Sequence, residues 1–195
     1  MMKKQYHHGD LKQELIRKGI QLLAREGYEG FSLRKLAALC GVSHAAPYKH
    51  FQSKEEIIAE IAKVIAAEFG TALNEAAGRY PQDSRRQLIA MCVEYVRFMA
   101  ERPDYFRFVF MTAHQNPIPI GGSLEAEGRF PFAVALDCAR AYFAPIHGED
   151  WQSDFLAVWS MLQGYALMLI CRTIDPGEDY LQPVQRMVEW YLDKN

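Results

Sequence analysis

Residues 31–62 read FSLRKLAALCGVSHAAPYKHFQSKEEIIAEIA, and this stretch decides the fold. Ser32 and Ser43 each precede a run of residues that can form a helix, and a serine hydroxyl is a good acceptor for the free N–H groups at a helix N-terminus. Between the two runs, Gly41 lets the backbone turn without a Cβ clash. The alanines on both sides of the turn are small enough for two helices to pack closely. The stretch therefore predicts two short helices joined by a tight turn.

Longer helices are predicted on both sides of this pair. Leucine and isoleucine recur at helical spacing over residues 10–26, and Gly27 ends that pattern. A serine caps the next helix, residues 53–78, whose first turn carries two glutamates where the helix dipole favours anions. The second short helix, residues 44–50, contains Pro47. Because proline donates no backbone hydrogen bond, we expect this helix to be tighter than usual or slightly bent.

The net charge of −2 hides an uneven distribution of charge along the chain. Residues 1–54 hold ten Lys and Arg against four Asp and Glu, a balance of +6, which leaves −8 for residues 55–195. Two short helices joined by a tight turn form the helix-turn-helix pattern, whose second helix enters the DNA major groove. The basic end is therefore predicted to contact DNA. Charge alone leaves a solvated basic face as the alternative.

The remainder of the chain predicts more helices and no strand. The segments add up to an all-α fold of about nine helices, with breaks at residues 80–83, 102–103, 114–123, 144–150 and 175–178. We expect two domains: an N-terminal helix-turn-helix DNA-binding domain at residues 1–52, and a C-terminal regulatory and dimerisation domain at residues 53–195. The long helix that starts at residue 53 links the two and can act as a lever.

Residues 155–171 are apolar almost all round, so a helix there must be covered on more than one side. A membrane span is the rival interpretation, but about 17 residues with a central glutamine are marginal for a bilayer. Burial against the chain's own core and a second copy fits better, because the last helix also carries an apolar stripe. The expected homodimer interface comprises Leu162, Leu169, Val184, Val188 and Tyr191.

Residues 10–62 resemble the N-terminal signature of the tetracycline-repressor (TetR) family. The resemblance includes the serine that starts the second helix, GVS at the turn, a Y-x-x-F pair formed by Tyr48 and Phe51, and SKEE at the start of the long helix. It implies a repressor that binds a palindromic operator in double-stranded DNA. By resemblance, the residues nearest the base edges are Ser43, His44 and Ala45, and those at phosphates are Ser32, Tyr48, His50 and Lys54. The predicted DNA-contacting set also includes Arg34 and Lys49. Hydroxyl, imidazole and ammonium groups are all suitable phosphate donors.

The sequence Trp159–Gly164, WSMLQG, is similar to the W-x-x-x-H-G motif of the family branch with a WHG-type C-terminal domain, although Gln163 stands where that branch usually has His. This likeness implies a regulatory domain that binds a small molecule. Aromatic and Met residues are dense between residues 91 and 111, and most of them can simply be core. A cavity for an apolar or aromatic ligand is built from the same residue types. The candidate wall residues are Met91, Tyr95, Phe98, Met111, Trp159 and Gln163, and the candidates for orienting a polar end of the ligand are Arg107, His114 and Arg172.

Other classes of function have weaker support. The sequence contains no G-x-S-x-G, H-E-x-x-H, G-x-G-x-x-G or P-loop motif, so an enzyme is disfavoured, and neither a cofactor nor a metal is expected. A DNA-binding regulator with no ligand, on the same frame, is the alternative function. The four cysteines, Cys40, Cys92, Cys138 and Cys171, are expected to be buried thiols. The N-terminus has no apolar run behind its lysines, which predicts a cytoplasmic protein. The adjacent His7 and His8 suit an arm along the DNA backbone or a disordered tail.

Overall fold

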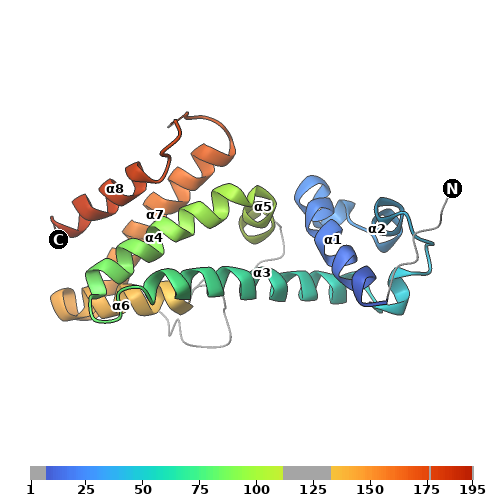
Figure 1. Ribbon diagram of the computed structural model, residues 1–195, viewed down its shortest axis with the longest axis horizontal. Helices are drawn as coiled ribbons and strands as arrows, with labels where there is room; N and C mark the ends of the chain where they lie inside the picture. Colours follow the sequence, from blue (N-terminus) through green and yellow to red (C-terminus); the bar gives the residue numbers. More distant parts are fainter. Residues whose placement is uncertain (1–7, 112–132, 176, 195) are drawn as a thin grey trace. The chain divides into compact units, whose positions relative to one another are not determined.

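The computed structural model describes residues 8–111, 133–175 and 177–194. Within these ranges the chain forms eight α-helices and two short 3-10 helices, with no strand (Figure 1). The α-helices are α1 (His8–Gly30), α2 (Leu33–Cys40), α3 (Lys54–Ala77), α4 (Ser84–Glu101), α5 (Pro103–Met111), α6 (Ala133–His147), α7 (Trp151–Ile170) and α8 (Gln182–Leu192), and the 3-10 helices are η1 (Pro47–Lys49) and η2 (Gly148–Asp150). The prediction of an all-α fold is confirmed.

The described residues divide into two compact units. The first unit contains residues 8–65 and 104–111, and the second contains residues 66–103 and the described part of 133–194. Helix α3 contributes buried side chains to both units at a spacing of four residues, which keeps successive side chains close together on its surface. These side chains are Ile57, Ile61 and Ile65 in the first unit and Phe69 and Leu73 in the second.

The core of the first unit forms where α1 packs against α2 and the start of α3. Helix α1 is kinked at Gly27, whose φ of 69° lies in the left-handed region that favours glycine, so the predicted end of the first helical pattern is the site of the kink. Gly19 of α1 faces Ile61 of α3, and a Cβ at residue 19 would lie 2.7 Å from the Ile61 Cδ1 atom. The missing side chain therefore leaves room for the Ile61 side chain to pack against the backbone of α1.

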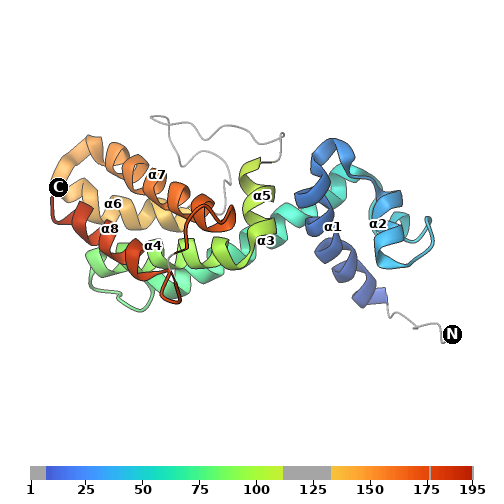
Figure 2. The same ribbon diagram turned by 90° about the horizontal axis from the view of Figure 1, so that it is seen from above.

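The second unit is a bundle of α4, α6, α7 and α8, together with the end of α3 (Figure 2). Helix α4 packs against α6, α7 and α8, while α6 and α8 each pack against α7. Its central position explains why α4 buries side chains on more than one face, including Ile89, Tyr95 and Phe98. Burial of such large apolar side chains is the main favourable contribution to folding a bundle of this kind.

A buried carboxylate links three helices of this bundle. Asp154 of α7 is only 7% exposed. Its Oδ1 accepts a hydrogen bond from the Tyr191 hydroxyl of α8 at 2.9 Å, and its Oδ2 lies 2.7 Å from Nδ1 of His147 on α6. Burial, and then the neighbouring Asp154 carboxylate, raise the pKa of Tyr191 to about 12. The polar cluster keeps an otherwise costly buried charge hydrogen-bonded.

The expected break at residues 144–150 and the expected burial of two of the four cysteines need correction. The predicted break at residues 144–150 is shorter, because α6 continues through Pro145 to His147; a proline in the last turn removes one hydrogen bond without ending the helix. Cys92 and Cys138 are buried as expected, but Cys40 is only partly buried and Cys171 is exposed at the end of α7.

The stretch Ala133–Ile170 is apolar enough in composition to cross a membrane. The structure divides it into α6, η2 and α7, and buries one side of α7 in the second unit. The core of a globular domain passes the same compositional test, so this stretch is weak evidence for a membrane span.

Two leucines of α2 provide a matched test of the first core. Leu36 is 0% exposed, whereas Leu39, one turn away, is 37% exposed. Truncation of the buried side chain leaves a cavity, so Leu36→Ala should lower the free energy of unfolding by about 2–5 kcal/mol. Leu39→Ala should cost under about 1 kcal/mol, because less of its apolar surface leaves water on folding. Urea denaturation followed by circular dichroism measures both, and equal losses would contradict this description of the core.

Candidate functional site

The ends of α2 are fixed by the residues that predicted them. Ser32 is the N-cap, and its hydroxyl oxygen accepts a hydrogen bond from the Lys35 backbone N–H at 3.2 Å. Gly41 follows the last helical residue with a φ of 68°, and its N–H donates to the Ala38 carbonyl at 3.1 Å. The Val42 N–H donates to the Ala37 carbonyl at 3.0 Å, which completes the turn. The sequence thus sets where the chain leaves α2 and in which direction.

The segment after the turn differs from the predicted α-helix at residues 44–50. Only Pro47–Lys49 form a helix, and it is a 3-10 helix, the tighter form that the proline predicts. The Ala46 N–H donates to the Ser43 carbonyl at 2.9 Å, and the His50 N–H donates to the Pro47 carbonyl at 2.9 Å. Pro47 has no N–H to donate to the Ser43 carbonyl, as an α-helix would require, so bonds between residues three apart predominate. The Phe51 N–H adds one α-type bond, to the Pro47 carbonyl at 2.9 Å.

The surface of this segment is open to solvent. Among the predicted DNA contacts, Arg34, Ser43, His44, Ala45 and Lys49 are exposed, and Tyr48 is 58% exposed. Ser32 and His50 are half-buried. Phe51, in contrast, is 1% exposed. The Y-x-x-F pair therefore has two tasks: Phe51 anchors the segment in the core while Tyr48 points its hydroxyl outward.

The side chain of Lys54 contacts Tyr28, within the first unit. Its ammonium donates to the Tyr28 carbonyl and lies 3.9 Å from the centre of the Tyr28 ring. The adjacent Ser53 accepts a hydrogen bond from the Glu56 N–H at 3.2 Å and so caps α3. The residue predicted as a phosphate contact thus also joins the start of α3 to the end of α1, and the exposed lysine and arginine among the predicted DNA contacts are Lys49 and Arg34.

A second candidate site is a small cavity in the second unit, of about 20 Å³. It is lined by side chains of α4, α6 and α7: Leu88, Met91, Tyr95, Ala135, Ala139, Phe155, Val158, Trp159 and Leu162. Three of these, Met91, Tyr95 and Trp159, were predicted as wall residues. A cavity of this volume has room for about one water molecule, so the site is closed in the conformation described.

The other three predicted wall residues are not among the residues that line the cavity. Gln163 is beside the cavity, where its Oε1 accepts a hydrogen bond from the Tyr95 hydroxyl at 2.7 Å. Burial raises the pKa of Tyr95, so the phenol stays protonated and remains a donor. Phe98 packs against Phe69, with ring centres 5.0 Å apart. Met111 belongs to the first unit and is 57% exposed, so it is not a wall residue.

The two described candidates for orienting a polar end of a ligand, Arg107 and Arg172, are not among the lining residues of the cavity. Arg107 is on α5 in the first unit, 3.4 Å from Asp104, and Arg172 is exposed just after α7. His114 and His7 lie outside the described residues.

Sequence reasoning missed six lining residues, of which Leu162 was predicted for the dimer interface instead: Leu88, Ala135, Ala139, Phe155, Val158 and Leu162. The signal was the helical spacing itself. Leu88, Met91 and Tyr95 repeat every three or four residues on α4, as Phe155, Trp159 and Leu162 do on α7. The alanines of α6 gave no such signal, because small residues mark a close approach only when the partner helix is known.

The predicted dimer residues are mostly inside the second unit. Leu162 is 3% exposed, and Val184 and Val188 are 0% exposed, so these side chains face their own core and are not available to a second copy. Leu169 and Tyr191 are partly exposed. The larger exposed apolar side chains of α7 and α8 are Leu156, Leu167, Met168 and Trp190. An apolar stripe read from sequence does not distinguish the side that packs inward from the side that stays open.

Two family models match successive parts of the chain. Residues 15–61 match the family described as "Bacterial regulatory proteins, tetR family". Residues 88–191 match "Tetracyclin repressor-like, C-terminal domain". The chain belongs to the TetR family.

Individual relatives of this TetR family member are distant. An uncharacterised HTH-type transcriptional regulator, YerO from Bacillus subtilis (strain 168), is 26% identical over 140 residues, which cover 67% of the chain and 44% of YerO. The chain thus spans less than half the length of that curated relative.

Two solved structures share the fold. A TetR family transcription regulator from Marinobacter aquaeolei VT8 is 16% identical, with a TM-score of 0.68 and coverage of 92% of this chain and 94% of that one. A TetR-like transcriptional regulator from Rhodococcus sp. RHA1 is 14% identical, with a TM-score of 0.72 and coverage of 100% and 97%.

The Tyr95–Gln163 hydrogen bond can be tested by a double-mutant cycle. Tyr95→Phe removes the donor and leaves a partly buried amide oxygen without it, which should cost about 1–3 kcal/mol of stability. In the Tyr95→Phe background, Gln163→Leu should restore much of this loss, because the polar partner is also removed. Thermal denaturation of the four proteins measures the coupling. Additive losses would show that the two side chains do not interact.

Proposed function

We propose that this TetR family member is a transcriptional regulator: a homodimer that binds a palindromic operator through two helix-turn-helix segments and is released from it by a small, largely apolar molecule. The observation that carries the proposal is a set of exposed side chains after the turn at Gly41, anchored by buried Phe51: Ser43, His44, Ala45, Tyr48 and Lys49. We place the boundary between the DNA-binding domain and the regulatory and dimerisation domain between residues 52 and 53.

The DNA contacts follow from exposure and chemistry. His44 and Ser43 present short polar side chains directly after the turn, where such a motif reads base edges. Tyr48 and Lys49 come next and offer a hydroxyl and an ammonium for phosphate oxygens. Arg34 adds an exposed cation from α2. The 3-10 geometry gives this segment a tighter turn than an α-helix, so its side chains have a different angular spacing.

Salt dependence and one lysine test this interface. Two basic units per dimer that neutralise about six to ten phosphates should lose about 10³ to 10⁵ in affinity between 50 and 200 mM salt. Lys49→Ala should weaken binding to all sequences to a similar degree, and His44→Ala should change sequence preference. Fluorescence anisotropy, on a duplex selected by the protein from a random pool, gives these values.

The matched control is Lys63→Ala, which removes an exposed lysine of α3 outside the helix-turn-helix and should leave affinity unchanged. Affinity that is flat with salt, or an equal loss in both lysine variants, would reject the proposed interface.

The homodimer is proposed to form through the exposed faces of α7 and α8. On α7, Leu156, Ser160, Gly164 and Leu167 are exposed at spacings of four, four and three residues, which places them on one side of the helix. A Cβ at Gly164 would face open space, so a second helix can approach this side closely. On α8, Trp190 is 63% exposed. A large apolar surface on a soluble protein suits an interface between copies, and two copies of one face are self-complementary about a two-fold axis.

A pair of substitutions on α8 distinguishes this face from the core. Trp190→Asp should leave the fold intact and shift the protein to a monomer, because a charge enters a dry interface. Val188→Asp puts a charge into the protomer core and should unfold the second unit. Light scattering with circular dichroism separates the two results. A folded dimer of Trp190→Asp with unchanged dissociation constant would refute this interface.

The proposed effector site is the cavity beside Tyr95 and Trp159. Since it is closed, a ligand must displace side chains to enter, and the ligand then stabilises an opened arrangement of α4, α6 and α7. Tyr95 also touches Phe69 of α3, with ring centres 5.6 Å apart and rings edge to face. A shift of Tyr95 can therefore reach α3, which continues to Lys54 beside the helix-turn-helix. This contact makes α3 the proposed lever.

Induction can be tested through its reciprocity. A molecule that binds the cavity and lowers operator affinity 5- to 150-fold, equivalent to about 1–3 kcal/mol, must itself bind that much more weakly when the operator is present. Trp159→Ala should keep operator affinity and respond poorly to the molecule. Calorimetric titration with and without operator measures both. Equal ligand affinity in the two states would remove the induction part of the proposal and leave the DNA-binding part, which is the ligand-independent regulator.

We further infer membership of the branch with a WHG-type C-terminal domain, supported by Trp159 at the cavity and Gln163 beside it on α7. A regulator of this type acts in the cytoplasm, where its DNA is, and needs no catalytic group.

A further inference from the structure

We propose that the groove between α4 and α8 is a second binding site, for a small amphipathic anion with an oxyanion head and an apolar body. The groove has a volume of about 790 Å³, within the range of small-molecule sites. Four arginines and a strip of apolar side chains line it. It shares no lining residue with the closed cavity, so it is a separate site on the second unit.

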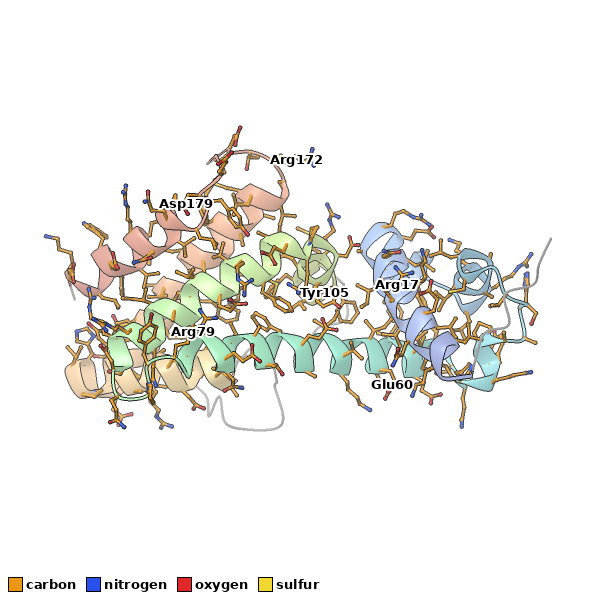
Figure 3. The ribbon with its side chains drawn as sticks, viewed as in Figure 1. Arg17, Glu60, Arg79, Tyr105, Arg172 and Asp179 are labelled. Carbon is orange, nitrogen blue, oxygen red and sulfur yellow. The ribbon has the colours of Figure 1, made fainter. Side chains whose placement is uncertain are left out.

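One end of the groove carries three arginine side chains. Arg79 lies in the turn between α3 and α4 (Figure 3), and Arg85 and Arg86 are in the first turn of α4. Arg85 pairs with Asp193 at 2.5 Å and Arg86 with Asp83 at 3.3 Å. Within the part of the chain that the structure describes, Arg79 makes no side-chain hydrogen bond or ion pair. Arg85 and Arg86 are already paired, so the Arg79 guanidinium is the group at this end that is available to a carboxylate or phosphate head that accepts paired hydrogen bonds.

The floor of the groove is apolar. Ile89, Ala90 and Val93 share one face of α4, and Leu181 adds an aliphatic side chain before α8. From Arg86 to Val93 the helix rises about 10 Å, so a hydrocarbon body of about that length can lie along it. Removing this strip from water favours binding of the apolar body.

The far end of the groove fixes the direction of the ligand. There the buried carboxylate of Glu94 accepts hydrogen bonds from Arg97 at 2.6 and 2.9 Å. Glu189 lies nearer the Arg79 end, one turn before Asp193 on α8, and accepts a hydrogen bond from Gln185 at 2.8 Å. Arg97 is thus matched by an acidic partner, whereas Arg79 has no side-chain partner among the residues that the structure describes. An anionic head is favoured at the Arg79 end and its tail points toward Glu94.

The groove stays open in the dimer proposed above. Successive residues of an α-helix are about 100° apart around its axis, so Trp190 is turned away from the groove, about 100° from Glu189 and about 140° from Gln185. A second copy seated on Trp190 therefore leaves the groove accessible to a ligand.

Calorimetric titration of the full chain with n-octyl phosphate tests the proposal. Inorganic phosphate and 1-octanol are the matched probes that lack the tail or the head. We expect one octyl phosphate site per chain. Inorganic phosphate and 1-octanol should each bind with an affinity about tenfold or more lower than that of octyl phosphate. Arg79→Glu and Arg86→Glu should each weaken octyl phosphate binding about tenfold or more, because each removes a charge-assisted contact.

Arg186→Glu makes the same charge change on an exposed face of α8 outside the groove, and should leave affinity within about twofold. Arg79 is in an exposed turn, so its substitution does not disturb the core. Unchanged affinity in both groove variants would overturn the proposal, as would no binding of octyl phosphate to the unaltered chain. A loss confined to Trp159→Ala would also overturn it, by assigning the anion to the closed cavity. None of these measurements involves DNA, so their outcome is independent of the proposed regulatory function.

Discussion

The buried stripe of α3 is the constraint on which the two units depend. Ile57 and Ile61 complete the core beneath the helix-turn-helix, and Phe69 and Leu73 complete the core of the bundle. One helix must therefore supply buried side chains to two separate cores from one continuous stripe. Close-packed interiors accommodate discrete rearrangements rather than gradual distortion. A change in how Phe69 packs against Tyr95 and Phe98 is thus a change of state, which is the property that a switch requires.

Proline in the segment after the turn shows how one residue changes a common motif. Pro47 is buried, so it adds to the core, but it prevents the α-helical hydrogen bond to Ser43. The result is a short 3-10 helix in which Phe51 remains anchored and Tyr48 remains exposed. The motif keeps its polarity, one side toward the core and the other toward solvent, while the spacing of its outward side chains changes.

Sequence reasoning predicted the fold well because helix ends are local. Ser32, Gly41 and Ser53 fix where helices begin or end through contacts within a few residues, and the structure has these contacts. The candidate site was only partly predictable, because cavity walls come from residues distant in sequence. Residue type alone predicted Tyr95 and Trp159, but Ala135 and Ala139 carry no signal without knowledge of which helices pack. The same limit explains why buried Val188 was taken for an interface residue.

The closed state of the cavity has a kinetic consequence. A volume of about 20 Å³ admits no organic molecule, so any ligand of this site must wait for a transient opening of α4, α6 and α7. Its apparent affinity is then reduced by the fraction of time that the site is open. At high ligand concentration the rate of entry reaches a plateau set by the opening motion. Selectivity follows from the same motion, because the side chains of the cavity wall repack around each ligand. A ligand that makes poor contacts with them dissociates when the cavity next opens.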